Sequence, residues 1–227
     1  MSRDYPAEPW RLAGEAYLSV WRVPVYALPR VPEVVTPVTF AGHAFVITAW
    51  IDYTPPGQLA YHELLATVAV RHGTRPAGSI TEIWVDSDAS LEGGRRLWGI
   101  PKEKAALDFR YGPTFTATAT ADRATPATPF PGAGTGGAGQ RAARPLARAT
   151  FTPRPIGSPA ARLTFSIIQA VAGSPYVSPV RAWARPRAAS ARWELAPDGP
   201  LGYLAGRRPL ASAHLRDARL VFGTPRR

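Results

Sequence analysis

Roughly ten short segments of this sequence are rich in β-branched and aromatic residues, with turn signals about every 8–12 residues between them. Residues 17–21, 80–85 and 162–172 are typical of these segments. Short strands at this spacing bury their apolar side chains against one another, so the pattern favours a sandwich or a barrel. We therefore predict a mainly β protein with few short helices.

Proline and glycine positions indicate how several segments are connected. Residues 1–15 are predicted to be irregular because prolines interrupt them. Residues 38–51 predict two strands that turn near Gly42. Further along the chain, residues 177–184 and 189–195 are predicted as two separate strands.

Two segments decide how much helix the chain is expected to contain. Residues 61–72 fit either a helix or a strand, but their valines and the alternation after Leu65 favour a strand. Residues 90–97 fit a short helix, with Ser90 as a suitable N-cap and the pair Gly93 and Gly94 limiting its length.

One stretch lacks the side chains needed for a packed core. Residues 124–145 consist mainly of alanine, glycine, proline and threonine. We predict a flexible Gly/Pro/Ala-rich loop at about residues 124–145, inserted in a single domain that spans residues 1–227.

Several classes of protein are excluded by composition. No apolar run approaches the roughly 18 residues of a membrane helix, and the N-terminus has no signal-peptide core. Cysteine is absent, so disulfides and thiolate sites are excluded, and His43, His72 and His214 lack metal-ligand spacing. We expect a soluble, cytoplasmic protein without a dedicated metal site and without a membrane partner.

The formal net charge of +11 raises the question of nucleic-acid binding. The arginines are scattered singly or in pairs among alanines and prolines, without a basic stripe or a recognisable binding module. We therefore expect no nucleic-acid partner, and only nonspecific contact with polyanions at low salt.

Lysine is nearly absent from this basic chain. Of its 27 lysine and arginine residues, only Lys102 and Lys104 are lysines. Arginine stays protonated, whereas a desolvated lysine amine can lose its proton and attack a carbonyl carbon. Lys102 follows Pro101 in the apolar context L-W-G-I-P-K. The sequence thus singles out Lys102 as a candidate nucleophile.

A longer run around Lys102 resembles a known family. Residues 94–104, G-R-R-L-W-G-I-P-K-E-K, are similar to the signature of the acetoacetate decarboxylases, in which Gly-Arg-Glu, an aromatic, Gly and Pro-Lys-Lys occur in this order. Y-H-E-L at residues 61–64 and I-W-V-D at residues 83–86 also resemble that family. The likeness extends loosely over nearly the whole chain and is specific only between Tyr61 and Leu107.

The resemblance implies a fold and a chemistry. The fold is a closed or nearly closed β-barrel or double β-cone. Lys102 matches the lysine that forms a Schiff base with a β-keto acid, and Glu63 matches the catalytic glutamate. No cofactor is implied, the substrate is a small oxo acid, and the family's large assemblies imply a homo-oligomer. The residues that we expect to line the substrate pocket are Tyr61, His62, Trp98 and Ile100.

The proposed chemistry needs a neutral amine. An ordinary lysine has a pKa of about 10.4, so only about 0.04% is neutral at pH 7. A pKa of about 7 would make half of it neutral, at a cost of about 4–5 kcal/mol in destabilisation of the ammonium. Desolvation near Trp98 and Ile100 is expected to supply this, and desolvation or a neighbouring cation activates the lysine in the family that this chain resembles.

Two positions depart from the family pattern. The family's second lysine is Glu103 here, and an arginine near its first strand falls at Gly14. A carboxylate beside Lys102 would raise the lysine pKa. Because neighbouring side chains of a strand point to opposite faces, we expect Glu103 to face outward, toward Arg95 or Arg96.

Three functions remain open from the sequence. The first is a cofactor-independent lyase that decarboxylates a β-keto acid through a Lys102 imine. The second keeps the imine but performs aldol condensation and dehydration of oxo acids, as some relatives of the family do. The third is a non-catalytic β-barrel that binds a small apolar ligand.

Overall fold

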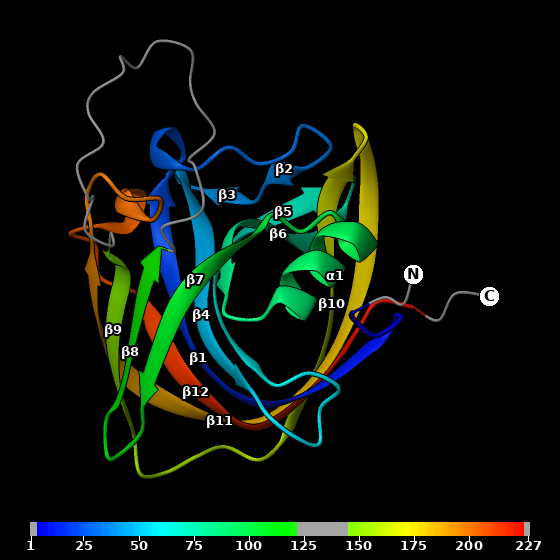
Figure 1. The fold of residues 1–227 in the computed structure, drawn as a ribbon. Coiled ribbons are helices and arrows are strands. Elements are labelled where there is room, and N and C mark those ends of the chain that lie inside the picture. Colours follow the sequence, from blue (N-terminus) through cyan, green and yellow to red (C-terminus); the bar gives the residue numbers. More distant parts are fainter. Residues whose placement is uncertain (1–3, 122–144, 225–227) are drawn as a thin grey trace, which may run out of the picture.

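The computed structural model describes residues 4–121 and 145–224 and is built almost entirely of strands (Figure 1). The prediction of a mainly β protein with few short helices is confirmed for these residues. The strands are β1 (Trp10–Pro24), β2 (Thr36–Pro37), β3 (Thr39–Phe40), β4 (His43–Tyr53), β5 (Tyr61–His72), β6 (Arg75–Val85), β7 (Lys102–Arg110), β8 (Phe115–Ala121), β9 (Pro145–Pro153), β10 (Ala161–Val171), β11 (Ser174–Leu195) and β12 (Ala211–Phe222). The helices are α1 (Asp88–Trp98) and two 3-10 turns, η1 (Val25–Ala27) and η2 (Gly202–Leu204).

Nine strands close into a ring. Their order is β6-β7-β8-β9-β11-β12-β1-β4-β5, and β5 pairs again with β6. Most neighbours are antiparallel, but β6 and β7 are parallel, from Ile83 opposite Lys102 to Val85 opposite Lys104. A parallel pair needs a crossover, and α1 provides it. The ring is therefore closed at the crossover that also places Lys102.

A second ring shares part of this sheet. β10 pairs with β11 and, at one position, with β6, so it closes a smaller ring through β12, β1, β4 and β5. The segments predicted as separate strands at 177–184 and 189–195 belong to the single strand β11. A register shift between Trp183 and Arg185 interrupts its pairing with β12, which lets the strand bend and change neighbours, from β10 to β9.

The central strands have two buried faces. Along β5, Leu64 belongs to the larger hydrophobic core, whereas Tyr61 belongs to a second one. The same alternation occurs on β6, where Trp84 and Val85 pack in different cores. Because successive side chains of a strand point to opposite faces, β5 and β6 form a wall between the two cores. This explains why residues 61–72 lack a clear polar face.

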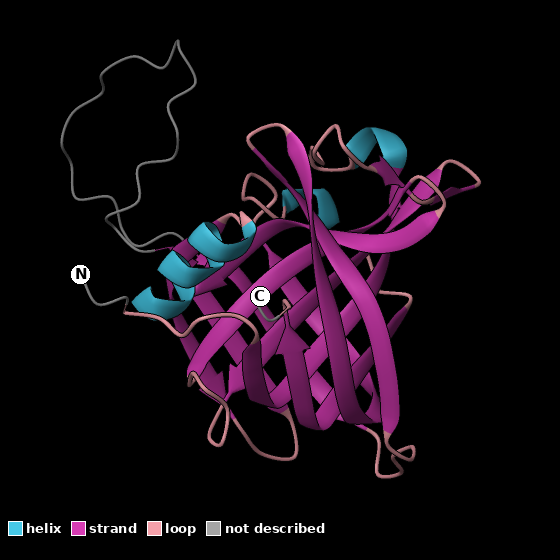
Figure 2. Ribbon diagram, turned by 90° about the vertical axis from the view of Figure 1, so that its right-hand side faces the viewer, coloured by secondary structure: helices cyan, strands magenta, loops and turns pink. Residues whose placement is uncertain are grey.

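The helix α1 lies across the strands (Figure 2), and its residues Leu97 and Trp98 belong to the second core. Its N-cap is Ser87, whose Oγ accepts the Ser90 N–H, so the prediction that Ser90 caps the helix is wrong. The helix also continues through Gly93 and Gly94 and ends at Gly99, which has a left-handed φ of 64°. These glycines allow close packing, since a Cβ on Gly93 would lie 2.5 Å from the Trp10 ring.

Other local predictions have mixed outcomes. The turn near Gly42 is confirmed, since β3 and β4 pair across it. β1 starts at Trp10, inside the residues 1–15 predicted to be irregular. The predicted flexible loop at about 124–145 lies outside the described residues except for Pro145, which begins β9. None of the helices in the described part of the chain is long and apolar enough to span a bilayer.

The two-sided wall leads to a stability prediction. Leu64 is 0% exposed in the middle of β5, so Leu64→Ala should lower the free energy of unfolding by about 2–5 kcal/mol. Leu163→Ala is the matched control, because Leu163 is 60% exposed and should change it by about 0.5 kcal/mol or less. Urea unfolding of both variants checks this, and equal losses would contradict the assignment of β5 to a central wall.

Candidate active site

Lys102 is the first residue of β7 and lies beneath α1. It is opposite Ile83 of β6, a residue of the second core, and only 4% of its surface is exposed. The helix can approach this closely because Gly94 has no side chain: a Cβ there would lie 2.7 Å from Lys102 Cδ and Cε. The lysine is thus enclosed between the sheet and the helix.

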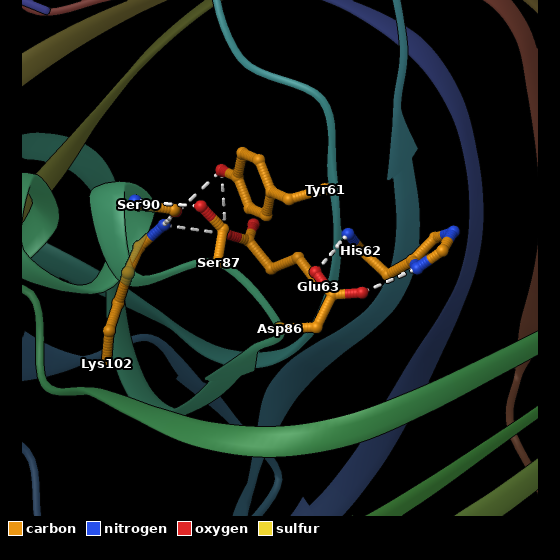
Figure 3. A network of polar contacts seen from close by, with 7 residues as sticks. All are labelled: Tyr61, His62, Glu63, Asp86, Ser87, Ser90 and Lys102. Atoms are coloured by element: carbon orange, nitrogen blue, oxygen red, sulfur yellow. Dashed lines mark hydrogen bonds and ion pairs between the residues drawn. The ribbon is translucent and has the colours of Figure 1, made fainter. Parts of the chain in front are cut away.

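The Lys102 amine is surrounded by three oxygen atoms (Figure 3). Nζ donates to Glu63 Oε2 at 2.8 Å and to Ser90 Oγ at 2.7 Å, and a longer contact of 3.4 Å reaches the Tyr61 hydroxyl. The Tyr61 hydroxyl in turn donates to Glu63 Oε2 at 3.2 Å. Tyr61 and Glu63 come from β5, whereas Ser90 comes from the first turn of α1. The site is therefore assembled from three elements.

The charges of this cluster are hidden from water. Glu63 is only 3% exposed, so Lys102 and Glu63 form a buried ion pair. Burial, followed by the nearby Glu63 charge, raises the pKa of both Tyr53 and Tyr61 well above 10, which keeps both phenols protonated. A proton moved from Nζ to Oε2 leaves a neutral amine and a neutral acid. The pair can thus produce a nucleophile without exposing a charge to solvent.

Aromatic rings form the apolar part of the site. The Lys102 Nζ lies 5.1 Å from the centre of the Tyr61 ring and 6.0 Å from that of Trp10. Trp98 packs edge-on against Trp10 with ring centres 4.7 Å apart, and its Nε1 donates to Glu8 at 2.9 Å. Ile100 belongs to the same core. Trp98 and Ile100 therefore support the walls of the site.

A cavity of about 510 Å³ adjoins this cluster at Tyr61. Its lining residues are Asp52, Tyr53, Thr54, Ala60, Tyr61, His62, Asp86 and Ser87. Tyr53 and Tyr61 have ring centres 4.7 Å apart and contribute to both the cavity and the second core. Although Tyr61 is shared, the His62 ring points away from Lys102, because consecutive residues of β5 face opposite ways (Figure 3).

A comparison with protein families places the whole chain. The model of the family described as acetoacetate decarboxylase (ADC) matches residues 3–224. The chain belongs to the acetoacetate decarboxylase family. Because the match extends over nearly the whole chain, it includes the wall of β5 and β6 as well as the region around Lys102.

Solved structures of this family share the fold. An acetoacetate decarboxylase from Legionella pneumophila has 17% identity and a TM-score of 0.67, over 98% of this chain and 88% of that one. The enduracididine biosynthesis enzyme MppR, complexed with the condensation product of pyruvate and imidazole 4-carboxaldehyde, has 17% identity and a TM-score of 0.62, over 98% and 89%. An acetoacetate decarboxylase-like enzyme from Sphingomonas wittichii has 18% identity and a TM-score of 0.58, over 96% and 92%. No curated protein sequence matches this chain.

Both departures from the acetoacetate decarboxylase pattern have a structural context. At Gly14 a Cβ would lie 1.8 Å from the Asp52 carbonyl oxygen, so this backbone leaves no room for the family's arginine. Glu103 is exposed and accepts a bond from Trp84 Nε1 at 3.2 Å, which keeps it away from the Lys102 amine. The outward orientation was expected, but the partner is Trp84. Arg95 instead donates to the Lys102 carbonyl oxygen.

Sequence reasoning did not identify Ser90 as a site residue. Its hydroxyl group is fully buried and contacts the Lys102 amine, whereas the sequence suggested only a helix cap. The spacing of Ser90 and Gly94 could have indicated this role, because residues four apart lie on the same face of a helix. Among the described residues, no group of three His, Cys, Asp or Glu side chains comes together to hold a metal ion.

The contact between Gly94 and Lys102 can be tested. A methyl group in Gly94→Ala should displace the Lys102 chain and weaken at least one of its oxygen contacts. We expect borohydride trapping of oxo acids on Lys102 to fall about tenfold or more, with the fold kept, because the neighbour is a flexible side chain. Mass spectrometry of the peptide measures this. Arg96→Ala on the exposed side of α1 is the control, and equal trapping in both variants would contradict the expectation.

Proposed function

We propose that this protein is a cofactor-independent lyase that decarboxylates a β-keto acid through an imine on Lys102. The observation that supports this most directly is the buried lysine amine held 2.8 Å from a buried carboxylate. General acid/base chemistry requires such a distance, and nucleophilic catalysis by lysine requires a neutral amine. Family membership supports the same assignment.

Imine formation begins with proton transfer from Lys102 to Glu63. The neutral amine attacks the keto carbon, and the carbonyl oxygen takes the proton held by Glu63 to give a carbinolamine. Loss of water, with the nitrogen lone pair forming the double bond, then gives a protonated imine on Lys102. For this, the carbinolamine nitrogen first gives one proton to the Glu63 carboxylate, and the hydroxyl group of the carbinolamine then takes that proton from Glu63 and leaves as water. The Tyr61 and Ser90 hydroxyls, which contact the Lys102 amine, would hydrogen-bond the departing oxygen in this proposal.

Decarboxylation follows because the protonated imine accepts electrons. The bond between the α-carbon and the carboxylate breaks, carbon dioxide leaves, and the electron pair forms a neutral enamine. This step removes one positive and one negative charge. Apolar surroundings such as Trp10 and the Tyr61 ring favour this loss of charge, since charged groups are poorly solvated in an apolar medium.

Product release requires one proton and one water molecule. The enamine carbon takes a proton that reaches it through Glu63 from solution, which restores the imine. Water then adds to the imine carbon, and the ketone leaves as the Lys102 amine is regenerated. Each turnover therefore consumes one proton from solution, and Glu63 is the group that carries it.

An aldol condensation followed by dehydration is the second candidate. The cavity of about 510 Å³ beside Tyr61 supports it, because the cavity has room for a second carbonyl compound and its lining among the described residues contains neither arginine nor lysine. Both candidates use the Lys102 imine. Release of carbon dioxide from the oxo acid indicates the first, and consumption of an added aldehyde without such release indicates the second.

The setting of the reaction is also proposed from the family. We expect a homo-oligomer that acts on a small oxo acid in the cytoplasm, with Tyr61, Trp98 and Ile100 around the reacting end of the substrate and His62 in the lining of the adjoining cavity. Sedimentation of the purified protein tests the assembly.

The first functional prediction concerns Lys102. A β-keto acid or 2-oxo acid with borohydride should attach to Lys102 near neutral pH and leave Lys104 free. Lys104 is the internal control, because it pairs with Asp88 at the surface. Lys102→Arg should abolish labelling and keep the fold, whereas Lys104→Arg should keep labelling. Equal labelling of both lysines, or none in the native chain, would exclude both Schiff-base reactions and leave a binding function.

The second functional prediction concerns Glu63. Glu63→Gln keeps the size of the side chain but cannot accept the Lys102 proton, so turnover should fall by about 10²–10⁴. Carbon dioxide release measured under steady state checks this. Glu103→Gln is the matched control, because its carboxylate is exposed and bonded to Trp84. A folded Glu63→Gln variant with near-normal turnover would remove Glu63 from the mechanism.

A further inference from the structure

The oxygen atoms around Lys102 come from two elements that are joined only indirectly. Tyr61 and Glu63 are fixed by β5, whereas Ser90 is fixed by α1. Their distances to the amine therefore depend on how the first turn of α1 is seated against the start of β5. The residue between these elements is Asp86, which follows β6 and immediately precedes Ser87, the N-cap of α1.

Asp86 binds the start of β5 at three points. Its Oδ1 accepts the His62 backbone N–H at 2.8 Å, and its Oδ2 lies 2.7 Å from His62 Nδ1. The Asp86 backbone N–H donates to the His62 carbonyl oxygen at 3.4 Å. The Asp86 carbonyl oxygen also accepts from Lys104 Nζ at 3.0 Å, which adds a link to β7. Asp86 thus connects three elements of the site.

The His62 ring lies on the other face of β5 from Glu63 and does not contact the Lys102 amine (Figure 3). It packs against Phe109 with ring centres 4.4 Å apart and lines the cavity of about 510 Å³. His62 is therefore placed to act on the site through Asp86 and Ser87, as a positioning residue.

Three carboxylates face His62. Asp86 comes from the segment between β6 and α1, Asp52 from β4 lies 3.6 Å from Nε2, and Asp108 from β7 adds a weaker attraction. The hydrogen bond with Asp86 is the largest cause that raises the pKa of His62 above its ordinary 6.5, against an opposing effect of burial. Burial raises the pKa of Asp86, but its bonds with His62 outweigh this and lower it.

We propose that His62 and Asp86 form a positioning pair that holds Ser90 against Lys102, and that deprotonation of His62 loosens this hold. The bond joins two opposite charges while His62 is an imidazolium, and it is weaker when the ring is neutral and only Asp86 is charged. A group whose pKa is raised on folding stabilises the structure below its unfolded pKa and loses that contribution as pH rises through the folded value. The hold is therefore tight at about pH 6 and weakens at higher pH.

Because the chain has only two lysines, acylation of the amines measures this hold directly. Acetic anhydride reacts with Lys102 only when the cluster around it opens, and free Nα-acetyllysine added to the same solution calibrates the reagent. Three chains are compared from about pH 5 to about pH 9: the native protein, His62→Asn and His62→Leu. Asparagine keeps a donor near the position of Nδ1 but cannot titrate, whereas leucine removes the donor.

We expect His62→Leu to increase acylation of Lys102 about tenfold at about pH 6, the size of effect that follows from losing one charge-assisted hydrogen bond. His62→Asn keeps a donor but not the charge, so it should raise acylation there only about threefold. Above the His62 pKa the native rate should rise relative to that of His62→Asn. His43→Asn and His43→Leu are matched controls. His43 begins β4, at the end far from Asp52 and His62, so neither substitution should change the acylation rate of Lys102.

The effect of this pair on catalysis rests on the proposed function, but the positioning role and the Schiff-base reaction can be rejected separately. If oxo acids label Lys102, the dependence of the labelling rate on the His62 pKa should disappear in His62→Asn. His62→Leu should lower the labelling rate, and His62→Asn should be closer to the native rate. Native-like acylation of Lys102 in His62→Leu at every pH would overturn the positioning role, whatever the labelling shows. Altered acylation without any labelling by oxo acids would keep the positioning role and reject the Schiff base. Should His62→Leu fail to fold, parallel pH profiles of the native and His62→Asn chains would overturn the proposal.

Discussion

A buried ammonium and a buried carboxylate 2.8 Å apart, Lys102 and Glu63, set the condition that the surrounding structure must meet. Removing two charges from water costs several kcal/mol per ion unless geometry and further hydrogen bonds compensate. Ser90 and Tyr61 provide these bonds, and Gly94 allows α1 to bring Ser90 close enough. The helix, the parallel pair of β6 and β7 and the wall of β5 are all arranged around this one contact.

The same pair connects the fold to the chemistry. One proton shared by Lys102 and Glu63 gives either an ion pair, which suits a closed resting site, or a neutral amine and acid, which suits attack on a carbonyl carbon. The aromatic walls favour steps that remove charge. Membership of the acetoacetate decarboxylase family and the geometry of the cluster both support the proposed class of enzyme.

Local patterns in the sequence predicted most strands, because alternation and turn residues act over a few neighbours. The turn at Gly42 is such a case. Features that depend on distant residues could not be predicted in this way. β11 is one strand because a bulge near Arg185 lets it change neighbours, and no local sequence pattern indicates this. Gly93 lies inside the helix and does not end it. Its lack of a side chain makes room for Trp10, which is far away in sequence. In the site, Lys102 was predicted because lysine is rare in this chain and because the surrounding residues resemble the family, and Glu63 was predicted from that resemblance. Ser90 could not be predicted without knowing which helix face turns toward Lys102.

The two-sided burial of β5 has a consequence for strand register. In most strands a slip by one residue is penalised because apolar side chains move into water. On β5 both faces are covered, so a slip would exchange Glu63 and Leu64 between two apolar compartments without exposing either. The penalty comes instead from leaving the Glu63 charge in the larger core, with Lys102 alone on the other side. The two residues proposed to do the chemistry thereby also specify how the strand is threaded.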